Sequence, residues 1–196
     1  MQKMAIAAML LAATAVTAAQ TDTKSGSEKY TATIANMASG SGSKIAIQVF
    51  QWSSDTDRQR VLETLRSNEE KKPDELAKAM AGLPTIGYIW ANGPAGYALK
   101  YAHRLTGPDG GERLVVMTDR LIGSLEHPAW KVSGQAVEPA QPYTVVELQL
   151  DNKGRGRGKM SLTTPVTIDE KTQTVSLANY DTASTLLTDV QRQPKS

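Results

Sequence analysis

The feature that most constrains the fold is a series of segments in which apolar and polar residues alternate, separated by short glycine-rich breaks. The clearest is YALKYAHRL, residues 97–105, in which larger side chains alternate with small or charged ones. A period of two is typical of a β-strand with two different faces. TGPDGG follows, and ERLVVMTD then runs back with the same period, so an antiparallel hairpin is predicted here.

Strand-like segments recur along most of the chain, and two helices interrupt them. The further strands are expected at 29–36, 44–52, 85–90, 143–150, 159–168, 174–180 and 184–191. Residues 53–67 and 71–83 change to a helical period, with Ser and Asp before the first apolar stripe, Pro73 near the start of the second helix and Gly82 at its end. Residues 121–142, with three prolines, indicate a long irregular connection.

These segments predict an α+β fold that is predominantly antiparallel β. About eight or nine strands joined by short turns favour a sandwich or barrel-like sheet, with the helical hairpin inserted on a face or over one opening. Residues 30–192 are long enough to bury one hydrophobic core without disulfides or metal sites, so they are expected to form a single domain. Residues 20–29 are polar and predict a flexible leader, and 193–196 a short tail.

The N-terminal 19 residues have the pattern of a signal peptide. Lys3 supplies the positive start, residues 4–16 are apolar, and small residues lead to Ala19, near which cleavage is expected. The apolar run is shorter than the roughly 20 residues that span a bilayer. An uncleaved anchor is the alternative. The prediction is an exported protein, periplasmic or extracellular, with no transmembrane span after cleavage.

Composition excludes several kinds of chemistry. The chain has no cysteine, so it contains neither a disulfide nor a thiolate nucleophile or ligand. The formal net charge is only +2, so no long-range field draws the protein to nucleic acid. No cofactor motif is present, and no cofactor is expected.

The stretch DNKGRGRGKMS, residues 151–161, resembles a phosphate loop but fails its requirements. Lys153 stands where the first glycine belongs, and Met160 where the hydroxyl belongs. The segment also lies between two predicted strands rather than before a helix. Residues 151–158 are therefore interpreted as a solvated turn, whose glycines and Asn152 tolerate positive φ.

Other catalytic signals are weak. SGSK, residues 41–44, matches a Ser-x-x-Lys motif without its companion motifs and outside any helix. The only histidines are His103 and His127, which excludes a three-histidine zinc site. A histidine–carboxylate site would need Asp109, Asp119 or Glu126 to converge by folding, and no metal site is predicted.

The aromatic residues are the strongest binding signal. Tyr88, Trp90, Tyr97 and Tyr101 fall on two successive strands, and a hairpin through ANGPAG would place them on one face. His103 follows on the same face of the second strand. These five residues are the candidate ligand-binding set. The alternative is that the rings simply fill an ordinary core, since the chain has one phenylalanine.

Several of these segments, in this order, resemble a family of small exported proteins of unassigned function from environmental bacteria, especially acidobacteria. The similar segments are QWSSDTDRQRVLETL, LPTIGYIW, GYALKYAHRL, DGGERLVVMTDR, YTVVELQLDNKGRGRGKMS and LANY. The resemblance covers most of residues 30–192. It implies one exported domain with the strand order given above, and it implies no catalytic residues.

The leading functional hypothesis is an exported, non-enzymatic binding module for a small or lipid-like apolar ligand. The second is an envelope structural or interaction protein that acts through a surface patch or a sheet edge. The third is a small hydrolase or lyase that uses His103 with Asp119 or Tyr101.

Overall fold

The computed structural model describes residues 26–35, 44–67, 72–91, 93–122, 131–132, 135–136, 141–161, 165–178 and 185–194. The predicted signal peptide, Trp130 and His127 lie outside this part of the chain. Among the described residues, neither helix has the length and apolar character needed to cross a membrane.

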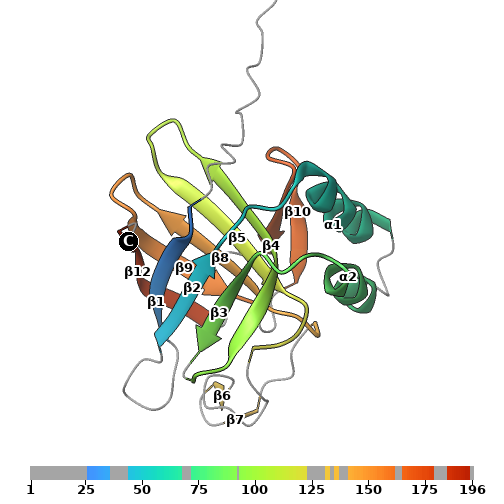
Figure 1. The fold of residues 1–196 in the computed structure, drawn as a ribbon, viewed down its shortest axis with the longest axis horizontal. Coiled ribbons are helices and arrows are strands. Elements are labelled where there is room, and N and C mark those ends of the chain that lie inside the picture. Colours follow the sequence, from blue (N-terminus) through green and yellow to red (C-terminus); the bar gives the residue numbers. More distant parts are fainter. Residues whose placement is uncertain are drawn as a thin grey trace, which may run out of the picture.

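An antiparallel sheet closes into a barrel (Figure 1), which confirms the predicted fold class. Around the barrel the order is β1-β12-β9-β8-β5-β4-β3-β2. The strands are β1 (Glu28–Ile34), β2 (Lys44–Val49), β3 (Gly87–Ala91), β4 (Gly96–Thr106), β5 (Glu112–Thr118), β8 (Val145–Leu150), β9 (Arg155–Met160) and β12 (Thr185–Arg192). Two small hairpins lie outside it, β6 (Lys131–Val132) with β7 (Gln135–Ala136), and β10 (Val166–Asp169) with β11 (Thr174–Leu177).

The barrel closes between its first and last strands. Tyr30 on β1 pairs with Arg192 on β12. β12 in turn pairs with β9, and its register shifts between Leu187 and Val190, where Asp189 has a φ of 50°. Such a bulge bends a strand and adds twist, which a barrel needs in order to close.

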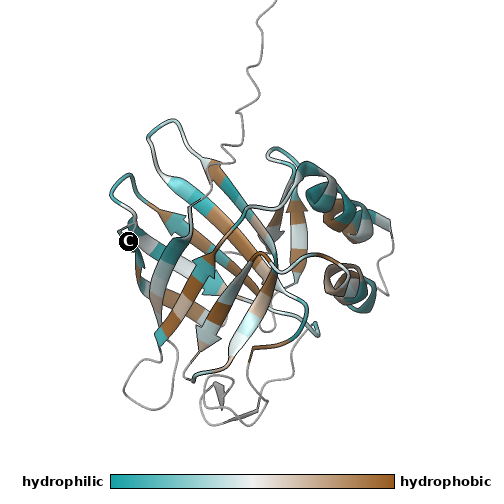
Figure 2. Ribbon diagram, viewed as in Figure 1, coloured by the Kyte–Doolittle hydropathy of each residue, from teal (hydrophilic) through white to brown (hydrophobic). Residues whose placement is uncertain are grey.

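The barrel interior is filled by aliphatic side chains. Alternation along the strands places one set of residues inside, as the banding in Figure 2 shows. The buried inner core comprises Tyr30, Ala32, Ile34, Ile45, Ile47, Val49, Ile86, Ile89, Leu99, Ala102, Leu114, Val116, Ile122, Val146, Leu148, Leu150, Met160, Leu187 and Val190. Each is at most 5% exposed, so they contact one another rather than open space.

Two helices cover one side of the barrel (Figure 1). The Ser54 hydroxyl caps α1 (Asp55–Ser67) by accepting a hydrogen bond from the Asp57 amide at 3.1 Å. Helix α2 (Lys72–Ala81) follows it, and the β10–β11 hairpin lies beside α1.

A second core joins this layer to the outer face of the barrel. It contains Val61, Leu62, Leu65, Leu76, Met80, Leu83, Tyr101, Val115, Met117, Tyr143, Val145, Val175 and Leu177. Val115, Met117 and Val145 come from the outer sides of β5 and β8, so these strands are buried on both faces.

The structure differs from the sequence interpretation between residues 151 and 168. Only the tip of residues 151–158 is a turn, because β9 begins at Arg155. A Cβ at Gly156 would lie 1.8 Å from the Gln149 carbonyl oxygen, so this glycine permits β8 and β9 to approach closely. The predicted strand 159–168 is also two elements, since β9 ends at Met160 and β10 belongs to a separate hairpin. At the N-terminus, β1 begins at Glu28, inside the predicted leader.

Candidate functional site

The candidate residues do not share one face. Tyr97 pairs with Ile89, which lies between Tyr88 and Trp90 on β3, so Tyr97 is on the opposite face of the sheet from those two rings. β4 also contains a bulge at Lys100. Leu99 pairs with Thr118 and Tyr101 pairs with Met117. Thr118 and Met117 are adjacent on β5, so Lys100 of β4 has no partner opposite it in the sheet. A single extra residue exchanges the two faces of a strand. Tyr97 therefore lies on the interior side, whereas Tyr101 and His103 lie on the outer side under the helices. The expectation that these residues share one face is wrong.

Tyr97 belongs to the inner core. It pairs with Ile89 of β3 and packs, partly buried, against the interior residues. Since those residues are almost completely buried, the ring completes a filled core at this level of the barrel.

Tyr88 and Trp90 lie on the outer surface of β3, where Phe50 joins them. The Phe50 and Tyr88 ring centroids are 5.9 Å apart in an edge-to-face arrangement, and those of Tyr88 and Trp90 are 5.8 Å apart. Phe50 is 44% exposed, and the other two rings are partly exposed. We call Phe50, Tyr88 and Trp90 the aromatic strip.

Small neighbours allow this strip to lie against the sheet. Trp90 pairs with Gly96 of β4, and a Cβ at Gly96 would lie 2.8 Å from the indole Nε1. Trp90 also faces Ala46 on β2, and Tyr88 faces Ala98 on β4. The indole therefore covers the bare backbone of β4, as aromatic residues do beside glycine in sheets.

Tyr101 and His103 are buried beneath the first turns of α1. Tyr101 is 0% exposed and His103 is 5% exposed. The residue between them holds the start of the helix, because Ser53 donates its amide to the Ala102 carbonyl and accepts the Ala102 amide on its hydroxyl, both at 2.9 Å. This pairing continues the sheet along β4 past Gly87, the first residue of β3. It also places Arg58 of α1 over β4.

Burial and the nearby cations shift the pKa values of these two side chains. Burial raises the pKa of the Tyr101 hydroxyl to about 12, although Arg58 acts in the opposite direction. For His103, burial lowers the pKa to about 4; Arg58 and Arg113 also lower it, while Asp55 raises it. At neutral pH both side chains are therefore uncharged.

Three buried polar atoms in this region have no hydrogen-bond partner within the described part of the chain. They are Arg58 Nε, Tyr101 Oη and His103 Nε2. Arg58 also makes an ion pair with the exposed Asp55, with 2.9 Å between Nη1 and Oδ1. We call Arg58, Tyr101 and His103 the α1–β4 cluster.

Arg113 supplies the neighbouring charge. It binds Glu147 through Nε at 2.7 Å and Asp169 through Nη1 at 3.1 Å. Glu147 also accepts the Leu177 amide at 3.1 Å, so this carboxylate ties the β10–β11 hairpin to the barrel.

The structure places Tyr101 beside His103, but it does not join His103 to the carboxylates considered for catalysis or metal binding. His103 pairs with Val115, whereas Asp119 follows the far end of β5 and binds Arg120 at 3.0 Å. Asp109 lies in the exposed 107–111 turn, where it accepts the Gly111 amide at 3.1 Å. Glu126 lies outside the described residues. Within those residues, no three potential metal ligands come together.

A charged network, which the sequence does not indicate, closes the end of the barrel at which β1 begins and β4 ends. Arg104 lies 3.1 Å from the Glu28 carboxylate and 3.8 Å from Glu112, and Arg192 binds Glu112 at 2.7 Å. These residues come from four strands, β1, β4, β5 and β12. The network therefore joins the two terminal strands to the middle of the chain.

Aromatic residues complete this closure. The Tyr30 hydroxyl donates to Glu28 at 2.7 Å, and burial together with that carboxylate raises the pKa of Tyr30. The Trp52 ring lies 4.8 Å from the Arg104 guanidinium carbon, in a cation–π contact. This end of the barrel is thus occupied by the protein's own side chains.

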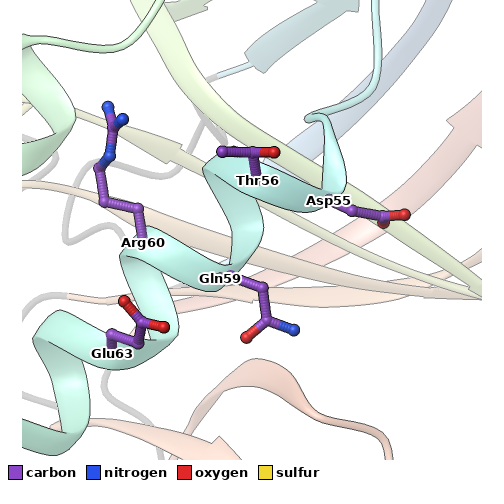
Figure 3. Close-up of a pocket in the computed structure, with 5 residues that line it drawn as sticks. All are labelled: Asp55, Thr56, Gln59, Arg60 and Glu63. Atoms are coloured by element: carbon purple, nitrogen blue, oxygen red, sulfur yellow. The ribbon is translucent and has the colours of Figure 1, made fainter.

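A shallow groove of about 430 Å³ lies along the outer surface of α1. Asp55, Thr56, Gln59, Arg60 and Glu63 line it (Figure 3). All five come from one helix, and in Figure 3 their side chains point in different directions rather than toward a common point. The groove therefore brings no set of functional groups together.

Comparison of the chain with protein-family models, with curated proteins and with solved structures finds no match.

Proposed function

We propose that this protein is an exported, non-enzymatic module that binds a protein partner through the aromatic strip. The observation that carries the proposal is the row of partly exposed rings of Phe50, Tyr88 and Trp90 on the outer face of the barrel. Exposed large aromatic side chains are uncommon on a surface that contacts only water, and Tyr and Trp dominate the binding energy of many protein interfaces.

The shape of this surface favours a macromolecule over the small apolar ligand. Sites for small molecules are concave and enclose most of the ligand. The aromatic strip instead lies on the outside of a closed barrel, whose interior is filled by the inner core. A flat or convex aromatic surface gains most from a partner that covers it and excludes water around its edges.

Export is the second part of the proposal, and it rests on residues 1–19. The test is the intact mass of the protein recovered outside the cytoplasm of the cells that make it. A mass that corresponds to a chain beginning close to residue 20 supports export with cleavage, whereas a full-length mass in the cytoplasm contradicts it.

Partner binding is tested with a pair of matched variants. Phe50→Ser with Tyr88→Ser removes two rings of the strip. Leu186→Ser removes the other large exposed apolar side chain within the described part of the chain, which is 39% exposed on β12. Each purified chain is immobilised and incubated with the envelope fraction of the producing cells. We expect wild type and Leu186→Ser to retain the same protein, and the double variant to lose it at least tenfold.

Hydrogen exchange of the resulting complex locates the contact. Protection of β3 and residue 50 supports the proposal. Equal retention by all three chains, or protection confined to another face, contradicts it. Sedimentation of the isolated wild type tests whether the chain binds a second copy of itself. A dimer that the double variant abolishes would identify the partner as a second copy and would contradict an interface with a different protein.

A further inference from the structure

We propose that the partner contacts the aromatic strip with an acidic segment, whose carboxylates pair with Lys29, Lys44 and Lys100. This inference rests on the proposed function, because it names the chemistry of the protein that the strip binds. The starting observation is the sign of the charge around the rings. Within the described residues, Lys29 and Lys44 are the only charged side chains on the outward faces of β1, β2, β3 and the part of β4 before its bulge.

This surface lies on the side of the barrel that the helices leave uncovered (Figure 1). The second core, which attaches the helical layer, takes its barrel residues from β4 beyond the bulge, β5 and β8, and none from β1, β2 or β3. Lys29 and Lys44 are both exposed.

The two lysines fall within the area that a partner on the strip would cover. Lys44 is two residues before the β2 partner of Trp90, so it is diagonal to that ring at roughly 7–8 Å. Lys29 is in the same cross-strand row as Tyr88, two strand spacings or roughly 10 Å away. A standard interface covers about 800 Å² on each partner, which corresponds to a radius of roughly 16 Å.

Lys100 flanks the strip from the other side. It is two residues beyond Ala98, the β4 partner of Tyr88. Its ammonium group donates to the Leu83 carbonyl at 3.0 Å and to the Thr85 hydroxyl at 3.3 Å. Both acceptors are neutral, so they do not balance its charge. None of the three lysines forms an ion pair with a carboxylate of the described residues.

A partner that covers the rings must also satisfy these charges. Contact removes water from the ammonium groups, and a charge that loses water without gaining a counter-charge is costly. An apolar partner surface would leave the lysines unpaired, and a basic one would repel them. Carboxylates offset the loss of water and attract the partner before contact. The charge around the rings therefore favours an acidic partner.

The closed barrel restricts recognition to side chains. Each barrel strand already pairs on both sides, so β2 and β3 offer no edge to which a partner strand could add. Ala46 and Ala98 leave the sheet surface low beside the rings. An acidic segment can thus place an apolar side chain against the rings and its carboxylates on the lysines.

A random peptide library displayed on phage tests the sign of the charge. We expect the immobilised wild-type chain to enrich peptides that combine acidic residues with an apolar or aromatic residue. The lysine variant, Lys29→Gln with Lys44→Gln, should enrich these peptides about tenfold less. Lys78→Gln with Lys171→Gln is the matched control, because it removes two exposed lysines outside this surface, and it should select as wild type does.

Rate constants for one selected acidic peptide separate charge from packing. We expect the lysine variant to lower the association rate constant by about tenfold at low salt, with a much smaller difference at high salt. The aromatic variant, Phe50→Ser with Tyr88→Ser, should instead mainly raise the dissociation rate constant, because it removes buried contact.

The outcomes distinguish this inference from the proposed function. Selected peptides without an excess of acidic residues, kept by the lysine variant and lost by the aromatic variant, overturn the acidic segment and leave the strip as the binding site. Peptides that the aromatic variant still binds overturn both. An empty selection overturns the acidic segment, while retention from the envelope fraction still decides the strip. Wild-type binding only to vesicles of equal parts phosphatidylglycerol and phosphatidylcholine, lost in both variants, identifies a lipid surface and overturns a protein partner.

Discussion

Ser53 and Ala102 exchange two hydrogen bonds, both 2.9 Å long. They extend the pairing along β4 past Gly87, where β3 begins. In Ser53→Ala the buried amide of Ala102 loses its acceptor, so we expect a loss of about 1–2 kcal/mol in the free energy of unfolding. Chemical denaturation measures it. Ser53→Thr, which keeps the hydroxyl, should recover most of the loss, and equal losses in both variants would contradict this explanation.

His103 should make stability depend on pH. Its folded pKa of about 4 lies below the ordinary histidine value of 6.5, so the unfolded chain binds more protons between these two values. The stabilisation is fully present above about pH 6.5 and is lost as the pH falls toward 4, by up to about 3 kcal/mol. In addition to burial, Arg58 and Arg113 oppose protonation and Asp55 favours it.

Urea titrations from pH 4 to pH 7 on wild type and His103→Gln measure this contribution. Other carboxylates titrate in the same range, so the relevant quantity is the difference between the two proteins. We expect the wild type to lose more stability on acidification than the variant. Parallel curves would show that His103 does not titrate differently in the folded state.

Gly156→Ala should disrupt the pairing of β8 with β9. Its Cβ would lie 1.8 Å from the Gln149 carbonyl oxygen, a backbone atom that moves only with the strand. We expect a destabilisation of about 3 kcal/mol, in the range of severe overpacking. In the control Gly93→Ala, the nearest atom is 4.0 Å away, so stability should change little. Equal stability of the two variants would contradict the proposed close approach.

Breaking the charged network should cost more than breaking a surface ion pair. Glu28→Leu leaves the Arg104 guanidinium without its nearest carboxylate and the Tyr30 hydroxyl without its acceptor. We expect a loss of about 2–3 kcal/mol, reduced in the double variant with Arg104→Met. Glu170→Gln at the Arg66–Glu170 pair, whose side chains are 40% and 69% exposed, should change stability by less than about 0.5 kcal/mol. Thermal unfolding that ranks Glu170→Gln as the more damaging change would refute this order.

The periodicity of apolar residues, together with helix caps and turn glycines, was sufficient to predict most of the fold. The α1 helix follows from its Ser54 cap and its stripe of Val61, Leu62 and Leu65. The turn at 107–111 and the tip at 151–154 follow from glycine, of which Gly110 and Gly154 have positive φ. These are local properties, which short stretches of sequence determine.

The candidate site was harder to predict because it depends on non-local geometry. Nothing around Lys100 indicates a bulge, yet that one residue separates Tyr97 from Tyr101 and moves His103 under a helix. Arg58 appears in the sequence as one charge of a solvated helix, and only the Ser53–Ala102 pairing places it over β4. Phe50 could have been found, since it directly follows β2, whose other face is already apolar.

The seam between β1 and β12 also affects when the protein can fold. A hydrogen bond from Gln193 to Thr31 spans 162 positions along the chain, so the barrel cannot close until nearly all of it is available. Contacts this distant are slow to form because a long loop must first be ordered. A nascent chain therefore remains open through most of its synthesis, and the arrival of its last strand completes the fold.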